Sequence, residues 1–441
     1  MIQNKMKPGI CLILSILFSA IICSAQNPII QTKFTADPAP MVYHDTVFLY
    51  TGHDEDDATG FKMINWLLYT STDMVNWTDH GAVASLENFS WAPKNGAWAQ
   101  QVIARNGKFY MYCPIHLKGI GVLVSDSPYG PFKDPLGKPM ISQGIDDIDP
   151  TVFIDDDGQA YMYWGNPNCW FVKLNNDMTS YSGQIVKIDS KPANYQEGPW
   201  FYKRNGHYYL AYSSTCCPEG IGYAMSDSPT GPWVYKGNIM DGYPISSGNH
   251  PGIIDYKGKS YVFGFNYTLN FALTKTHRER RSVCLEKLTY NNDGTIQQLP
   301  FWSAAGTAQV GTLNPFVRNE AETISWENGV KTTSDTQKGI FVTDIDNDDY
   351  IRIRGLDFGA GAKGYQANVA TISGGNIEIR IDSLAGKVLG TCAVNGTGSG
   401  SNWDAIQCKV KRVKGVHDVY FVFKGGKDKL FNFDWWRFSK I

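Results

Sequence analysis

The stretch Val152-Phe-Ile-Asp-Asp-Asp-Gly-Gln-Ala-Tyr-Met-Tyr163 decides the fold, because it joins an apolar strand, a tight turn and a second strand of alternating large side chains. The Asp-Gly pair at its tip is typical of a hairpin turn, since glycine tolerates a positive φ. The same pattern recurs along the chain at residues 41–50, 102–112, 201–210 and 253–263. The repeat therefore predicts a chain built from equivalent antiparallel units.

Each copy is followed by a second hairpin-like segment, such as Ser125-Asp-Ser-Pro-Tyr-Gly-Pro-Phe132 and Ser226-Asp-Ser-Pro-Thr-Gly-Pro-Trp233. Two hairpins supply four strands in a repeat of roughly 50 residues, which is the size of one propeller blade. Since the repeat occurs five times, we predict a five-bladed β-propeller over residues 26–303.

The composition changes after Pro300. Residues 304–316 are small and polar, which predicts a linker, and short alternating strands resume from residue 317, as in 376–382 and 417–423. This pattern predicts a separate β-sandwich of the jelly-roll type over residues 317–441. The predicted fold class is therefore all-β.

The charge of the chain limits its partners. The 441 residues include 40 Lys and Arg against 42 Asp and Glu, a formal net charge of −2. A chain so balanced predicts no basic surface for a phosphate backbone, so nucleic acid is not an expected partner. We expect a monomer.

The N-terminal residues are typical of a secretory signal peptide. Lys5 and Lys7 precede an apolar run over residues 10–22, and small residues follow before Gln26. This pattern predicts cleavage after Ala25 and export to the periplasm or the medium. The run is too short for a comfortable membrane span, and no later stretch is apolar enough to predict one. A lipoprotein anchored at Cys23 is the alternative, although Ile22 suits that position poorly.

Export permits disulfides, and seven cysteines lie after residue 25. An odd number leaves at least one free thiol. Cys392 and Cys408 form a plausible local pair. The spacing of the cysteines is not that of a zinc site.

Candidate catalytic residues open the inner strands of the predicted blades, where the blades converge on the propeller axis. Counting back from each turn gives one residue per blade: Asp37, Trp98, Asp149, Glu197 and His250. Carboxylates gathered around a dry axis repel one another, an arrangement that proteins retain mainly for function. The alternative is that the Asp-Pro dipeptides only start turns.

Paired acids in a chain rich in aromatic rings indicate sugar chemistry. Cleavage of a glycosidic bond needs one carboxylic acid for the leaving oxygen and one carboxylate for water. Trp98 is a candidate sugar contact because of its inner position, whereas Trp91 suits either a sugar platform or the core.

With these motifs in place, the first 300 residues resemble glycoside hydrolase family 43. The resemblance is carried by Thr35-Ala-Asp-Pro38, Asp147-Ile-Asp-Pro-Thr-Val-Phe153, Gln196-Glu-Gly-Pro-Trp200, Gly248-Asn-His-Pro-Gly252 and Arg281-Ser-Val-Cys-Leu-Glu286. It implies a five-bladed propeller that hydrolyses arabinose- and xylose-containing polysaccharides with inversion. It also implies that Asp37 is the general base, that Glu197 is the general acid, and that Asp149 orients Glu197 and raises its pKa.

The same resemblance implies further contacts. His250 matches a position near an axial ion or water, often calcium, with a buried hydrogen-bonded histidine as the alternative. Arg281 matches a residue that reaches the sugar hydroxyls. The segment Phe263-Gly-Phe-Asn266 departs from the family's usual Tyr-His-Asn, which puts a substrate contact from that loop in doubt.

Residues 317–441 resemble a family 6 carbohydrate-binding module. The carriers are Glu320-Ala-Glu322 and the segment from Lys424 to Trp435. The resemblance implies a structural calcium held by Glu320, Glu322 and Asp434, which are the oxygen ligands that this cation prefers. Trp403 and Asn432 match sugar-contacting positions, but Asp344 stands where the module's second aromatic residue is expected.

The leading hypothesis is an exo-acting glycoside hydrolase that releases α-L-arabinofuranosyl or β-D-xylosyl groups from xylan-type plant cell-wall polysaccharide. The choice between arabinose and xylose stays open. An endo-arabinanase and a non-catalytic carbohydrate-binding propeller are the alternatives.

Overall fold

The computed structural model describes residues 26–440 except 190, 245–248, 337 and 396–399. The predicted signal peptide, with Cys23, therefore lies outside the described residues. The described part of the chain contains no helix with the length and apolar character that a membrane crossing requires.

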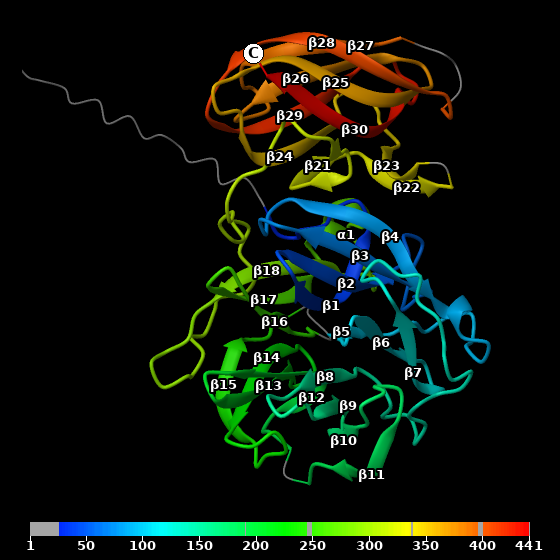
Figure 1. The fold of residues 1–441 in the computed structure, drawn as a ribbon, viewed down its shortest axis with the longest axis vertical. Helices are drawn as coiled ribbons and strands as arrows, with labels where there is room; N and C mark the ends of the chain where they lie inside the picture. The colour runs from blue at the N-terminus through cyan, green and yellow to red at the C-terminus, as the bar shows by residue number, and fades with distance from the viewer. Residues whose placement is uncertain (1–25, 190, 245–248, 337, 396–399, 441) are drawn as a thin grey trace, which may run out of the picture.

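The first domain is the predicted five-bladed propeller, drawn from blue to green in Figure 1. Blade one contains β1 (Phe34–Tyr43), β2 (Thr46–Asp54), β3 (Asn65–Ser71) and β4 (Trp77–Ser85), followed by the short 3-10 helix η1 (Leu86–Asn88). Blade two contains β5 (Gln101–Arg105), β6 (Lys108–Ile115) and β7 (Gly119–Ser125). Blade three contains β8 (Thr151–Ile154), β9 (Ala160–Trp164), β10 (Trp170–Leu174) and β11 (Tyr181–Lys187).

The last two blades complete the ring. Blade four contains β12 (Tyr195–Arg204), β13 (His207–Ser214), β14 (Gly220–Ser226) and β15 (Val234–Met240). Blade five contains β16 (Gly252–Tyr256), β17 (Lys259–Asn266), the helix α1 (Thr268–Thr274) and β18 (Ser282–Leu288). Blades two and five thus have three named strands each, whereas the repeat predicted four.

In blade two, isolated bridges replace the fourth strand: Ile120 pairs with Ile141, and Val124 pairs with Lys133. In blade five, the chain leading into β1 and the first residues of β1 lie along the outer edge of β18. The backbone N–H of Ile29 donates to Val283 (2.8 Å), and that of Thr35 donates to Arg281 (2.9 Å). These bonds join the two ends of the propeller, so the ring is closed by backbone pairing between segments far apart in the sequence.

The second domain is the predicted sandwich, drawn in yellow to red in Figure 1. One sheet contains β22 (Lys331–Asp335), β23 (Gly339–Thr343), β30 (Phe431–Lys440), β25 (Ala362–Thr371) and β28 (Trp403–Val413), with β19 (Asn319–Glu320) paired to β30. The other contains β21 (Trp326–Asn328), β24 (Tyr350–Asp357), β29 (Val416–Lys424), β26 (Gly375–Ile381) and β27 (Val388–Val394). Their facing side chains form one apolar core, in which Phe421 and Trp436 are fully buried.

Cys392 and Cys408, the pair expected from the sequence, lie in this sandwich as free thiols, Cys392 buried and Cys408 partly exposed. Among the described cysteines, the disulfide joins Cys216 to Cys217 instead.

The sandwich sits directly against blade one (Figure 1). The strand β20 (Thr323–Ile324) is the outermost strand of the blade-one sheet, paired with β4, although its residues follow the linker. A buried polar cluster lies beside it: the Asp79 carboxylate accepts hydrogen bonds from Lys33 of the propeller and from Thr332 of the sandwich (2.6 Å). The Lys33 ammonium group also donates to Thr332 (2.5 Å). The two domains are thus joined by a shared sheet and a shared ion pair.

We expect Asp79→Ala to lower the free energy of unfolding by about 3 kcal/mol, because it leaves the half-buried Lys33 ammonium without its counter-charge. Urea unfolding followed by tryptophan fluorescence measures this loss. The control is Asp57→Ala, which removes an exposed ion pair with Lys62 and should leave the midpoint unchanged. Equal midpoints for both variants would contradict a stabilising role for the cluster.

Candidate active site

The inner strands of all five blades begin at one end of the ring, and this end carries the candidate catalytic residues. In each blade the second strand runs back to the same end, so the loop between the second and third strands also lies there. These five loops are residues 55–64, 116–118, 165–169, 215–219 and 267–281. We call this end the active-site face. Because it brings together five inner-strand starts and five loops, groups distant in the sequence meet on it.

A narrow cavity marks the propeller axis on this face. Every blade contributes to its lining. The first lining residue of each blade lies two positions before the first regularly paired residue of the inner strand, and these residues are Asp37, Ala99, Asp149, Gly198 and His250. The cavity measures about 20 Å³. This volume holds about one water molecule, so a sugar ring must bind above the axis.

Local backbone geometry turns these positions toward the axis. Asp37, Asp149 and Gly198 have φ values of 50, 58 and 56°, and each precedes a proline. A positive φ is costly for an aspartate and is found mainly where the surrounding structure requires it. At Gly198 a Cβ atom would lie 2.8 Å from the His250 ring, so only glycine fits against the imidazole.

Two of the five predicted inner residues are displaced by one position. Glu197 precedes the axial Gly198, and Trp98 precedes the axial Ala99. The displacement changes the exposure of the carboxylates: the Glu197 side chain is 16% exposed, compared with 2% for Asp37 and 3% for Asp149. Glu197 therefore points toward the space where substrate can bind, while the two aspartates lie deeper.

His250 holds the three carboxylates together. Its Nδ1 atom lies 3.5 Å from Asp37 Oδ1, and its Nε2 atom lies 3.5 Å from Glu197 Oε1 and 3.8 Å from Asp149 Oδ2. The imidazole ring thus separates Asp37 from Glu197. In inverting glycosidases the two catalytic carboxyl groups lie about 6.5–9.5 Å apart. A separation of Asp37 and Glu197 by one imidazole ring, with a contact of 3.5 Å on each side, is compatible with that distance.

The protonation of the cluster follows from burial and from these charges. Burial by itself lowers the pKa of His250, but the carboxylates of Asp149, Asp37 and Glu197 raise it to about 10. Burial also raises the pKa of Asp149, to about 8, against the opposing effect of the His250 charge. At neutral pH the cluster therefore contains an imidazolium and a protonated Asp149.

Glu197 differs from the expectation that Asp149 raises its pKa. Burial raises the pKa of Glu197, but the His250 imidazolium, the Arg281 charge and a hydrogen bond from Asn166 together bring it below its ordinary value. Protonation of Asp149 is favoured over protonation of Glu197, because Asp149 is the more deeply buried carboxyl group and the Asn166 amide donates to Glu197.

Arg281 binds carboxylates, whereas the sequence predicted that it reaches the sugar. Its guanidinium group is buried, donates twice to Asp54 (both 2.9 Å) and donates through Nη1 to Asp37 Oδ1 (2.8 Å). Burial raises the pKa of Asp37, and the Arg281 charge opposes that increase. Arg281 therefore favours the charged form of Asp37, which a general base requires.

Sequence reasoning missed three residues of this site. Asp54 orients Arg281, and Asn166, from the loop after β9, binds Glu197. Phe61 is 45% exposed; its ring lies 5.1 Å from that of Trp98 and 5.3 Å from the Arg281 guanidinium carbon. Asn166 stands beside a proline, as Asp37, Asp149 and His250 do, but the repeat does not mark its loop.

The two predicted tryptophan contacts behave differently. Trp98 pairs with Phe61 to form an aromatic wall near Arg281, although it is not an axial residue. Trp91 packs against Phe89, with ring centroids 5.0 Å apart, and donates its indole N–H to Asp134 (3.2 Å). We therefore interpret Trp91 as a packing residue.

The positive charge among the axial carboxylates could come from the predicted axial ion or from the His250 ring itself. Asp149, Glu197 and His250 each offer a ligand atom within 4.8 Å of the others. However, the imidazole holds a proton up to a pKa of about 10, so the ring supplies the positive charge among these carboxylates. The axial ion stays a prediction.

In the sandwich, the carboxylates predicted to bind calcium do have unmet hydrogen-bonding capacity. Glu322 Oε2 and Asp434 Oδ2 are buried without a hydrogen bond. Burial raises the pKa of Glu322 well above its ordinary value, and the nearby charges of Glu320 and Asp434 add to the increase. Two cations already lie beside these groups: Arg318 is 2.7 Å from Glu320 and 3.5 Å from Asp434 Oδ1, and the Lys338 ammonium is 3.5 Å from Asp434 Oδ2. Calcium prefers oxygen ligands of this kind, but among the described residues these three carboxylates are not a group whose ligand atoms all lie within 4.8 Å of one another. The calcium site therefore stays a prediction.

The predicted sugar contacts of the sandwich are occupied by protein partners. The Trp403 ring lies 5.0 Å from that of Phe341 and 5.4 Å from the Lys338 ammonium. Asn432 is buried; it accepts a hydrogen bond from Thr343 (2.8 Å) and donates to Gly400 (2.8 Å). Asp344, at the position where a second aromatic residue was expected, is exposed beside Lys429.

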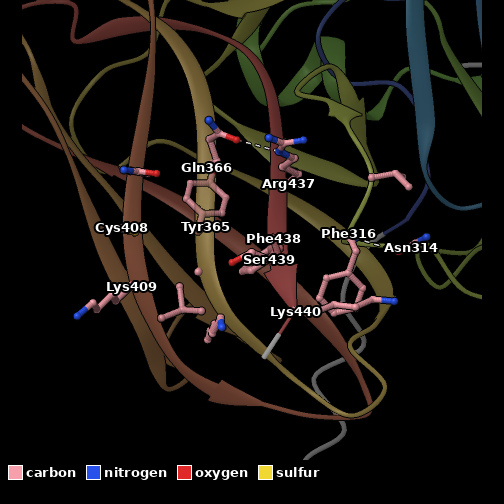
Figure 2. A pocket seen from close by; sticks show the side chains of 15 residues that line it. Asn314, Phe316, Tyr365, Gln366, Cys408, Lys409, Arg437, Phe438, Ser439 and Lys440 are labelled. Carbon is pink, nitrogen blue, oxygen red and sulfur yellow. Dashed lines mark hydrogen bonds between the residues drawn. The ribbon is translucent and has the colours of Figure 1, made fainter.

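A wide groove lies elsewhere on the sandwich. Figure 2 shows it between the linker and the sheet that contains β25, β28 and β30, with Phe316 on one side and the hydrogen-bonded pair Gln366 and Arg437 across it. Its volume is about 1180 Å³. None of its lining residues belongs to the cluster around His250, so the groove is separate from the candidate active site.

Comparisons with known proteins agree with this geometry. The family described as glycosyl hydrolases family 43 matches residues 25–296, and carbohydrate binding module (family 6) matches residues 320–440. An arabinoxylan arabinofuranohydrolase of Bacillus subtilis is 36% identical, with 94% of this chain and 92% of the relative covered. A xylosidase/arabinosidase of Bacteroides ovatus is 30% identical over 61% of this chain and 95% of its own.

A solved structure extends the likeness to both domains. The crystal structure of a family 43 arabinoxylan arabinofuranohydrolase from Bacillus subtilis, in complex with cellotetraose, superposes with a TM-score of 0.86 at 34% identity. The superposition covers 95% of this chain and 98% of that one. The similarity thus includes the sandwich as well as the propeller.

The charge cluster generates a prediction that needs no substrate. We expect the His250 ring to be protonated at pH 7 and to lose its proton near pH 10. Replacing Asp149 with Asn removes one of the carboxylates that raise this pKa, so the titration should move to lower pH. NMR of ¹⁵N-labelled histidine measures it, and Asp227→Asn, which changes an exposed carboxylate outside the cluster, should leave the His250 titration unchanged. A neutral His250 at pH 7 would contradict the assignment.

Proposed function

The chain belongs to glycosyl hydrolase family 43, and on that premise we propose that it is an exo-acting hydrolase that removes α-L-arabinofuranosyl groups from arabinoxylan. The observation that carries the proposal is the cluster of Asp37, Asp149 and Glu197 around His250. The relative named an arabinoxylan arabinofuranohydrolase covers both domains, which favours arabinose over xylose. β-D-Xylosyl groups are the second candidate, since the Bacteroides ovatus relative is named for both sugars.

Asp37 acts as the general base. Arg281 donates to its Oδ1 atom (2.8 Å), and this contact favours the carboxylate over the acid. A water molecule above the axis gives its proton to Asp37 while its oxygen attacks the anomeric carbon. Because the attack comes from the face opposite the leaving group, the configuration at that carbon inverts.

Glu197 acts as the general acid. It is the most exposed of the three carboxyl groups and therefore the one that the glycosidic oxygen can reach. The proton resides on Asp149 before substrate binds, and both carboxyl groups contact the same nitrogen of His250. A sugar bound above Glu197 excludes water and disfavours its charge, so the shared proton moves to Glu197 and then to the leaving oxygen.

The alternatives considered from the sequence receive less support. A non-catalytic propeller has no need for a complete acid–base set, yet all three predicted carboxyl groups lie at one site here. An endo-arabinanase would release oligomers from arabinan, whereas the relatives reported above are named an arabinoxylan arabinofuranohydrolase and a xylosidase/arabinosidase.

Hydrolysis of wheat arabinoxylan tests the proposal. We expect free arabinose as the product, and we expect Glu197→Ala and Asp37→Ala each to lower kcat by about 10²–10⁴-fold, the usual contribution of a general acid or base. The control Asp227→Ala removes an exposed carboxylate near His207 and should match the wild type. Wild-type rates in both catalytic variants would refute the roles, and oligomeric products would favour endo action.

We further propose that Glu320, Glu322 and Asp434 bind a structural calcium ion. This is supported by the buried carboxylate oxygens without hydrogen bonds and by their oxygen-only chemistry. The ion would offset the mutual repulsion of these carboxylates and stabilise the start of the sandwich. The sandwich itself would hold the enzyme on polysaccharide.

Chelation tests the calcium site. Because a ligand that binds only the folded state raises stability, by about 2.7 kcal/mol at 100 times its Kd, EDTA should lower Tm by several degrees. Added calcium should restore it. In Glu322→Gln/Asp434→Asn the carboxylate charges are gone, so Tm should no longer respond to EDTA. An equal response in the variant and the wild type would place the ion elsewhere.

We also propose that the protein is exported and acts as a monomer in the periplasm or the medium. Export is supported by the sequence of residues 1–25, and a polysaccharide substrate too large to enter a cell is consistent with it. Mass spectrometry of the secreted protein, which should begin at Gln26, measures the cleavage.

A further inference from the structure

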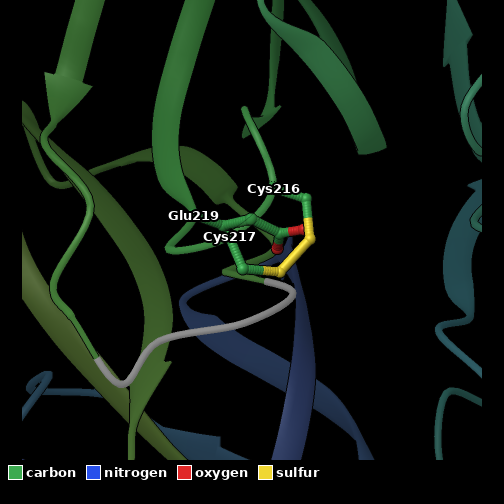
Figure 3. Close-up of side chains that lie close together, drawn as sticks. All are labelled: Cys216, Cys217 and Glu219. Atoms are coloured by element: carbon green, nitrogen blue, oxygen red, sulfur yellow. A yellow bond between two sulfur atoms is a disulfide. The ribbon is translucent and has the colours of Figure 1, made fainter.

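A disulfide between neighbouring residues lies on the active-site face. Cys216 and Cys217 are joined in the loop between β13 and β14, and Figure 3 shows the two sulfur atoms beside the Glu219 carboxyl group. Strand pairing places this loop near the general acid: Glu197 of β12 lies opposite Ser213, and Tyr195 lies opposite Ser214. The disulfide therefore begins three residues beyond the position that faces Glu197.

The loop is attached to the strands that carry Glu197 and His250. The backbone N–H of Thr215 donates to the carbonyl of Asn194 (2.7 Å), three residues before Glu197. The buried Glu219 carboxylate accepts a hydrogen bond from the backbone N–H of Asn249 (3.2 Å), the neighbour of His250. Contacts at both ends of the loop thus hold the disulfide in a defined position relative to the catalytic groups.

The disulfide itself is exposed, whereas the residues on either side of its loop are buried. Cys216 and Cys217 are both open to solvent, while Ser214 and Glu219 are buried. Polarisable sulfur and two adjacent Cβ atoms form a small apolar surface on the active-site face.

Stabilisation does not explain this cross-link. A disulfide stabilises a protein mainly by restricting the unfolded chain, and the effect grows with the length of the loop that it closes. Cys216 and Cys217 are adjacent, so the closed loop is the shortest that the chain can form. What the bond changes is the surface: two flexible polar thiols become one rigid apolar element.

The chemistry of the reaction indicates what this surface meets. Glu197 gives its proton to the glycosidic oxygen, so the sugar chain attached to that oxygen must lie beside Glu197. Blade four supplies both Glu197 and the disulfide loop. We propose that the Cys216–Cys217 disulfide is a binding surface for the leaving chain, contacting the apolar face of a xylose ring next to the cleaved bond. This inference rests on the proposed function.

Binding measured without turnover tests the contact. The parent protein is Glu197→Gln, which keeps the site but removes the acid, and the compared variant adds Cys216→Ser and Cys217→Ser. Calorimetry with an arabinosyl-substituted xylo-oligosaccharide should show a Kd about tenfold higher in the variant, the scale of one lost apolar contact. Methyl α-L-arabinofuranoside lacks a leaving chain, so its Kd should change less between the parent and the serine variant than the Kd of the oligosaccharide does.

Two controls separate a contact from a change in folding. Cys408→Ser in the same parent changes a free thiol of the sandwich and should leave the Kd of the oligosaccharide unchanged. Reduction of the parent with a phosphine, with mass spectrometry to count the thiols formed, should raise that Kd without any substitution. Reoxidation should restore it.

The outcomes distinguish this inference from the proposed function. If the parent binds both ligands and the serine variant binds the oligosaccharide equally well, the disulfide is not a contact. Equal losses for both ligands would assign the disulfide to the shape of the pocket and would also overturn the inference. If the parent with its intact disulfide binds neither ligand, the proposed function is wrong and the inference falls with it.

Discussion

The positive charge of His250 is the interaction on which the active-site face depends. Three carboxyl groups from three blades lie within 3.8 Å of its two ring nitrogens. Without that charge their repulsion would oppose closure of the ring, since blades one, three and four each bring one of these groups to the axis. Arg281 adds a second buried cation, shared between Asp37 and Asp54. Closure of the propeller and assembly of the catalytic groups are thus coupled by electrostatics.

The backbone enforces this arrangement at some conformational cost. Asp37 and Asp149 adopt positive φ values, which are uncommon for residues other than glycine, and Gly198 leaves space for the imidazole ring. The same bulge in β12 that places Gly198 at the axis moves Glu197 one position outward. Of the two deeply buried groups, Asp37 holds negative charge and Asp149 holds the proton. Glu197, which lies further out, can reach a glycosidic oxygen. The division of roles therefore arises from one irregularity in strand pairing.

Much of the architecture was predictable because it depends on local patterns. Hairpin turns with Gly, as at Gly158, and alternating strands predicted the blades, and the pattern after residue 317 predicted the sandwich. The strand β20 was not predictable, because its pairing with β4 depends on how the two domains pack. For the same reason the sequence did not show that Asp79, Lys33 and Thr332 meet between the domains.

The candidate site divides in the same way. The sequence by itself determined the residue types at the starts of the inner strands, and so it identified Asp37, Asp149, Glu197 and His250 as one group. Only the tertiary structure decided the contacts of Arg281, which binds Asp54 from a position 227 residues away, and the location of the proton on Asp149. Both depend on burial and on charges that act through space, and these exist only once the five blades have closed around the axis.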